Sequence, residues 1–150
     1  MHFHANYVST SVFGDGDYYQ ATFEAEQDTD DPDSPYLLIQ RQFEDADDHR
    51  CYIETHDEKY CGHFRLRRVD FTPQKLSIKL DRPRDNLVNV TFAMAATEFA
   101  EASEVVKIIN GDVVQDSKGA NARVDLRRPL NREGASAARQ MAQRRGSEKQ

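Results

Sequence analysis

The sequence predicts an α+β fold, a largely antiparallel, twisted β-sheet of about seven strands with one C-terminal amphipathic helix packed on it. Two observations lead to this expectation. Apolar and polar residues alternate with a period of two in most segments up to Met94, as in half-buried strands. From Phe99 onward the apolar spacing changes to three and four residues, which is the helical period.

The first strands are expected on either side of Gly14–Asp17, because a Gly-Asp-Gly-Asp sequence favours a tight hairpin turn. Val8 and Val12 alternate with serines before this turn, and Tyr19–Ala25 alternates after it. Tyr36–Ile39 is a continuous apolar run, which is typical of a central strand covered on both faces.

A second hairpin is predicted from Cys51–Thr55 and Tyr60–Phe71. The apolar positions change phase between Leu66 and Val69, so a β-bulge is expected near Arg67-Arg68. The two clearest alternating strands follow, at Leu76–Leu80 and Val88–Met94.

The helix is predicted from one apolar stripe, formed by Phe99, Ala102, Val106 and Ile109. Thr97 is the expected N-cap, and Lys107 suits the last turn because cations are favourable at a helix C-terminus. Gly111 is expected to end the helix.

Charge divides the 150-residue chain into two parts. Residues 1–110 contain 21 acids and 11 Lys/Arg, which gives −10, and are expected to form a single α+β domain. Residues 111–150 contain 5 acids and 9 Lys/Arg, which gives +4, and few large apolar side chains. This segment is predicted to be a basic, mostly disordered or weakly helical tail.

The acids concentrate between Asp15 and Asp48, where twelve carboxylates accompany one basic residue, Arg41, for a sum of −11. This concentration of negative charge would produce a negative electrostatic potential, which repels nucleic acid and anionic membranes and attracts basic proteins. The plainer alternative is that these acids only keep the protein soluble.

Neither a metal site nor an active site is expected. Cys51, Cys61 and His63 lie close in sequence, but no CxxC or HxxxH pair gives the spacing of a zinc site, and both thiols are expected to be free. There is no GxSxG, no phosphate-binding glycine loop and no dinucleotide motif, so the sequence predicts neither an enzyme nor a cofactor.

The chain shows no apolar run near the roughly 18 residues of a membrane span and no secretory signal, so a cytoplasmic location is expected. A basic patch in the second half is expected to pair with acids of the first half and not with nucleic acid. Its members are Arg65, Arg67, Arg68, Lys75 and Lys79.

The block from Tyr36 to Asn110 resembles the immunity protein 10 family, cytoplasmic antidotes to bacterial polymorphic toxins. The likeness is carried by Tyr36–Arg41, similar to the family's Y-x-x-L-Q-R strand, by Tyr52-Ile53-Glu54, similar to its Y-V-E segment, and by the later strands and helix. Tyr60–His63 stands where the family has a glycine-rich stretch, with Cys61 and His63 departing from that pattern.

The resemblance implies an inhibitor that binds a cognate toxin domain and has no catalysis of its own. A basic nuclease is one class of toxin that an acidic binder would suit. The sequence defines neither the toxin nor the oligomeric state. The predicted contact residues are the loop acids and two candidate aromatic anchors: Asp28, Asp30, Asp31, Asp33, Glu44, Asp45, Asp47, Asp48, Tyr18 and Tyr36.

Two other classes of function stay open at this point. Phe23, Leu38, Phe64 and Phe92 could line the cavity of a ligand-binding barrel or of an enzyme of unknown reaction. A regulatory nucleic-acid binder would instead act through Arg65, Arg67, Arg68 and the tail.

Overall fold

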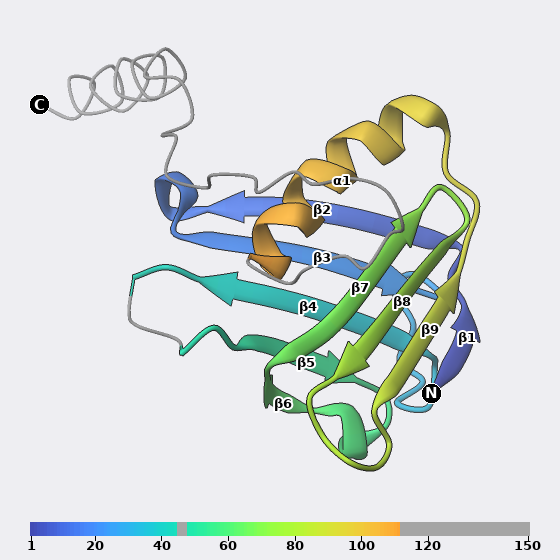
Figure 1. The fold of residues 1–150 in the computed structure, drawn as a ribbon. Helices are drawn as coiled ribbons and strands as arrows, with labels where there is room; N and C mark the ends of the chain where they lie inside the picture. The colour runs from blue at the N-terminus through green and yellow to red at the C-terminus, as the bar shows by residue number, and fades with distance from the viewer. Residues whose placement is uncertain (45–47, 112–150) are drawn as a thin grey trace, which may run out of the picture. The chain divides into compact units, whose positions relative to one another are not determined.

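The computed structural model describes residues 1–44 and 48–111, and these form nine strands, two short 3-10 turns and one helix (Figure 1). In chain order they are β1 (His2–His4), β2 (Tyr7–Phe13), η1 (Gly14–Gly16), β3 (Tyr18–Glu24), β4 (Tyr36–Gln42), β5 (Cys51–Thr55), η2 (Glu58–Tyr60), β6 (Gly62–Phe64), β7 (Leu66–Thr72), β8 (Lys75–Leu80), β9 (Leu87–Thr91) and α1 (Ala96–Asn110).

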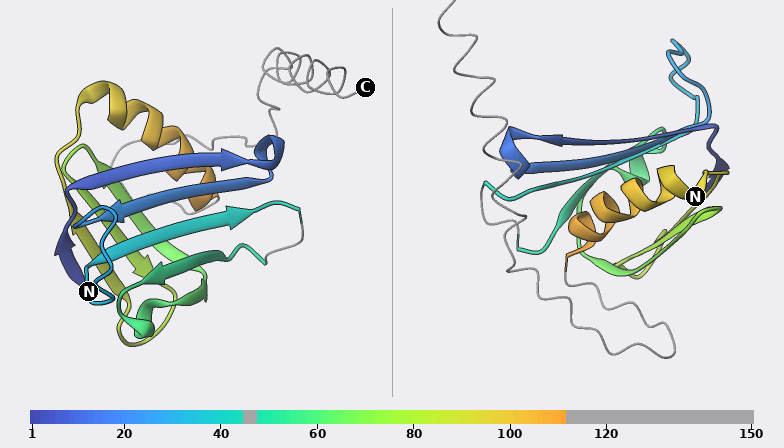
Figure 2. Two further views of the ribbon diagram at one scale, coloured as in Figure 1. Left: turned by 180° about the vertical axis from the view of Figure 1, so that it is seen from behind. Right: turned by 90° about the horizontal axis from the view of Figure 1, so that it is seen from above.

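The strands form two facing sheets, with orders β2-β3-β4-β5-β6 and β1-β9-β8-β7. Neighbouring strands are antiparallel except β1 and β9, which run parallel with His2–His4 beside Asn89–Thr91. The right-hand view of Figure 2 shows α1 between the layers, and α1 contacts β2, β3 and β4 of one sheet and β7 of the other. The α+β prediction is confirmed, but the described strands divide between two sheets.

The division arises partly within Tyr60–Phe71, which the sequence suggested was one strand. β6 ends at Phe64 in the five-stranded sheet, and β7 begins at Leu66 in the four-stranded sheet. Arg65 lies at the crossing, where its carbonyl accepts the N–H of Asp81 at 2.8 Å. The period-two pattern continues through such a crossing, so it does not reveal that the chain changes layers.

The predicted β-bulge is confirmed, because the register of β7 against β8 shifts between Leu66 and Arg68. Val69 is consequently fully buried and lies opposite Ile78. Without the shift, Val69 would point away from the core.

β4 is central in its sheet, as expected, but only one of its faces is fully covered. Leu37 and Ile39 are completely buried, whereas Leu38 points to the opposite face and is half-buried. The expectation of a strand covered on both faces is therefore wrong.

Helix α1 buries the predicted stripe at Ala102, Val106 and Ile109. It begins after Ala95 and not at Thr97, because the Glu98 carboxylate accepts the Ala95 N–H at 3.2 Å and so caps the first turn. Gly111 ends the helix with a φ of 56°, as predicted.

The predicted tail lies outside the described residues from position 112 onward. Within residues 1–44 and 48–111, no helix is long and apolar enough to cross a membrane.

Candidate protein-binding surface

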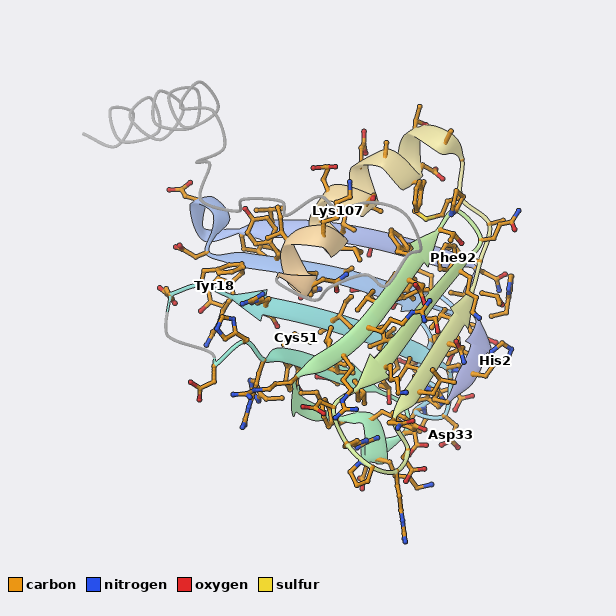
Figure 3. All side chains as sticks on the ribbon, in the orientation of Figure 1. His2, Tyr18, Asp33, Cys51, Phe92 and Lys107 are labelled. Carbon is orange, nitrogen blue, oxygen red and sulfur yellow. The ribbon has the colours of Figure 1, made fainter. Side chains whose placement is uncertain are left out.

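The described members of the predicted acidic set lie at two opposite ends of the five-stranded sheet. The β3–β4 connection enters β4 at one end, and the β4–β5 connection leaves it at the other. A seven-residue strand separates them by roughly 20 Å. Figure 3 labels one residue at each end, Tyr18 and Asp33. The structure therefore does not gather the described acids of the predicted set into one surface.

The β3–β4 connection, residues 25–35, contains five carboxylates and no Lys or Arg. Asp28, Asp30, Asp31 and Asp33 are all exposed here. Asp31 also shapes the turn, because its Oδ1 accepts the Asp33 N–H at 3.0 Å and its carbonyl accepts the Ser34 N–H at 3.1 Å. Asp31 thus stabilises the turn in addition to contributing a negative charge.

The opposite end of the sheet, called here the η1 end, combines acids with apolar side chains. The Tyr18 hydroxyl donates a hydrogen bond to Glu44 Oε2 at 2.8 Å. The predicted residues Asp45 and Asp47 lie outside the described residues. The η1 end consists of Val12, Phe13, Asp15, Asp17, Tyr18, Phe43, Glu44 and Asp48.

Three of its apolar side chains are unusually exposed: Val12 at 51%, Phe13 at 52% and Phe43 at 46%. Phe13 lies opposite Tyr18 on the sheet face that points away from the core. Val12 and Phe43 belong to the other face of the same end, where the Phe43 ring meets Tyr19 edge-on at 5.8 Å. The sequence prediction did not include these exposed side chains, although Val12-Phe13 breaks the polar–apolar alternation beside the turn.

Two arginines, Arg41 and Arg50, lie near this end, and Arg41 forms a hydrogen bond with helix α1. The Arg41 guanidinium lies 5.0 Å from the centre of the Phe43 ring, and its Nη1 donates to the Ile109 carbonyl at 3.5 Å. A cation there is favourable because the helix C-terminus is electronegative. Arg50 is exposed. Four carboxylates against two arginines leave the described part of this end net negative.

Tyr36, the other predicted anchor, belongs to a hydrogen-bonded group at the β3–β4 end. Its hydroxyl donates to Glu54 Oε1 at 3.0 Å, and the Tyr52 hydroxyl donates to Oε2 of the same carboxylate at 2.9 Å. Burial, and then the Glu54 hydrogen bond, raise the pKa of Tyr36 to about 12. The pKa of Tyr52 is also raised, chiefly by its own hydrogen bond to Glu54.

Replacing Glu54 with glutamine is expected to move the pKa of Tyr36 from about 12 toward its ordinary value of 10.0, and to lower that of Tyr52. Because the folded pKa of Tyr36 is raised, its contribution to stability is complete below about pH 10 and is lost as pH rises through 12. Ultraviolet titration of tyrosinate in Glu54→Gln and Tyr36→Phe, beside the unaltered protein, measures the shift. A titration curve of Glu54→Gln that matches the curve of the unaltered protein would contradict the role of Glu54 in raising these pKa values.

The cysteines and His63 do not converge on a metal site. Cys51 and Cys61 form no disulfide, and Cys51 is buried. The Cys61 sulfur accepts the Thr55 N–H at 3.3 Å, and His63 lies beside the Tyr52 ring with the ring centres 5.2 Å apart. Across the part of the chain that the structure describes, no group of three or more His, Cys, Asp or Glu side chains is placed to hold an ion.

The residues suggested for a ligand cavity do not line one together. Phe23 and Phe92 are buried with their ring centres 5.4 Å apart, Leu38 points to the outer face, and Phe64 lies under the Arg82 guanidinium. A groove of about 490 Å³ does lie between β2 and α1, and Phe92 borders it.

The basic patch pairs differently from the expectation. Arg67 contacts Asp81 at 2.6 Å and Arg68 contacts Asp70 at 2.8 Å, so both partners come from the four-stranded sheet or the turn that follows β8. The expected pairing with acids of the first half is wrong for these two arginines. Both pairs are largely exposed, and such pairs contribute little to stability.

Comparisons with protein families, with curated proteins and with solved structures find no match. The resemblance to immunity protein 10 is therefore a prediction from the sequence alone.

Proposed function

We propose that this protein is a non-catalytic, cytoplasmic immunity protein that binds and neutralises a toxin domain through its η1 end. The observation that carries the proposal is the meeting of exposed apolar side chains with carboxylates at that end. Aromatic anchors surrounded by charged groups are typical of protein-binding surfaces. The sequence resemblance to immunity proteins supports the same class.

The negative charge of the η1 end favours a partner with a cationic surface, and a nuclease toxin is one such partner. Carboxylates would steer a basic domain into contact and accelerate association. Phe13 and Tyr18 would then supply the desolvated contact that holds the complex. A typical interface buries about 1,600 Å² in total, which is more than one strand end offers, so adjoining loops would share the contact.

The decisive experiment is coexpression with the toxin domain encoded beside this protein's gene, scored by rescue of bacterial growth. Rescue together with a purified complex supports the proposal. A toxic neighbour that this protein neither binds nor neutralises rejects it.

Two sets of charge-neutralising substitutions are expected to identify the acidic end that makes contact. Asp15→Asn, Asp17→Asn, Glu44→Gln and Asp48→Asn alter the η1 end; Asp28→Asn, Asp30→Asn, Asp31→Asn and Asp33→Asn alter the β3–β4 connection. Each set removes four negative charges and changes the net charge from −6 to −2. Asparagine is chosen because Asp15 and Asp48 have φ values of 58° and 51°, which it tolerates.

Both sets should slow association at low salt, since both reduce the overall field. Only the η1 set should also accelerate dissociation, because only those carboxylates would contact the toxin. Surface plasmon resonance at two salt concentrations separates the effects. Faster dissociation with the β3–β4 set alone would place the contact at the β3–β4 connection and reject the η1 end.

A further inference from the structure

Among the residues that the structure describes, strand β2 is a sheet edge that no other strand covers. The described strands leave four edges, namely β1, β2, β6 and β7. β1 and β6 have only three residues each, and β7 has Arg67, Arg68 and Asp70 along its length. β2 has seven residues and neither a charge nor a proline. Proteins usually protect a long edge with one of these features, because an open edge can pair with another strand.

The open hydrogen-bonding groups of β2 can be identified from the ladder of its neighbour. The Ala25 N–H donates to the Pro35 carbonyl and the Phe43 N–H to the Asp17 carbonyl, so the odd residues of β3 bond toward β4. Its even residues then bond toward the odd residues of β2. The N–H and C=O groups of Val8, Thr10 and Val12 are consequently directed at the free edge.

The sequence of β2, Tyr-Val-Ser-Thr-Ser-Val-Phe, reads nearly the same in both directions about Thr10. An antiparallel copy centred there would place Thr10 opposite Thr10, Val8 opposite Val12, and Ser9 opposite Ser11. Tyr7 would lie opposite Phe13, which gives an aromatic cross-strand pair. The pairs at Thr10, Val8 and Val12 are also those with open backbone groups, so each would exchange both N–H···O bonds.

We propose that β2 of one copy pairs antiparallel with β2 of a second copy, about a two-fold axis through Thr10. This joins the two five-stranded sheets into one continuous sheet. Such an interface is isologous, as in most homodimers. The groove between β2 and α1 leaves room beneath Val8, where Val12 of the second copy would project. One strand pair is a small contact, so dissociation constants in roughly the micromolar range are expected.

Sedimentation velocity of the full chain over a concentration series tests this directly. A reversible dimer is expected, and a monomer at every concentration overturns the proposal. Thr10→Pro removes an N–H that faces the open edge, and it breaks no hydrogen bond within the protomer. The variant should therefore be folded, as judged by circular dichroism, and monomeric, as judged by sedimentation velocity. A dimer that persists in folded Thr10→Pro overturns the proposal as well.

A pair of double variants tests the register and stays informative if Thr10→Pro fails to fold. Ser9→Lys with Ser11→Lys places like charges opposite each other across the axis, whereas Ser9→Glu with Ser11→Lys places opposite charges there. The dimer dissociation constants should differ by roughly tenfold or more. Equal constants in the two variants exclude this register.

Discussion

Phe23→Ala is expected to lower the free energy of unfolding by about 3–5 kcal/mol, the usual cost of removing a buried phenylalanine ring. Phe23 is completely buried, and its ring contacts Phe71 from the opposite sheet edge-on, with the ring centres 6.2 Å apart. Phe71 in turn packs on Phe99 of α1 at 5.0 Å. The substitution would therefore open a cavity where both sheets and the helix meet.

Urea denaturation followed by circular dichroism measures this loss. Phe13→Ala is the matched control, since the same atoms are removed from a half-exposed ring, and it should cost less than about 1 kcal/mol. A typical domain is stable by only roughly 5–15 kcal/mol, so Phe23→Ala should also lower the soluble yield. Equal losses for the two variants would show that the layers do not close over Phe23.

Phe13→Ala is expected to weaken toxin binding by about 2 kcal/mol or more, which is roughly 30-fold in dissociation constant. The ring lies beside Tyr18 at the η1 end, where a partner could desolvate it fully. Isothermal titration calorimetry with the cognate toxin domain measures the change.

Tyr7→Ala is the control for this experiment. Tyr7 is the aromatic residue at the other end of β2 and is 45% exposed, close to the 52% of Phe13. If β2 strands pair between copies, both substitutions weaken that pairing equally, because each residue lies opposite the other. A difference between them in toxin binding therefore reports the toxin surface alone. Equal toxin affinity in the two variants would remove Phe13 from the interface.

The strands and the helix were predictable because their signals are local. Leu76, Ile78 and Leu80 alternate with polar residues, and all three are fully buried. The phase shift before Val69 revealed the bulge for the same reason. The division into two sheets was not predictable, since a period of two is identical whichever sheet a strand joins. The helix start was misplaced because its cap is the Glu98 side chain reaching back to Ala95.

The candidate surface was predictable only in part. Acids that are close in sequence were expected to be close in space, but β4 carries the chain to the opposite end between Asp33 and Glu44. Tyr18 belongs both to the predicted set and to the η1 end, whereas Phe13 and Phe43 were not in the predicted set. Whether an apolar side chain at a strand end is covered depends on the opposite sheet and the helix, and hydrophobic patterning contains no such information.

The parallel pairing of β1 with β9 has a consequence for the order of folding. Each of β2 to β6 pairs with its neighbour in the chain, so that layer can assemble from local hairpins as a nascent polypeptide emerges. β1 precedes the other described strands in the chain, yet its partner residues Asn89–Thr91 are made after all the other described strand residues. Such a long-range closure raises the contact order, and a higher contact order slows folding.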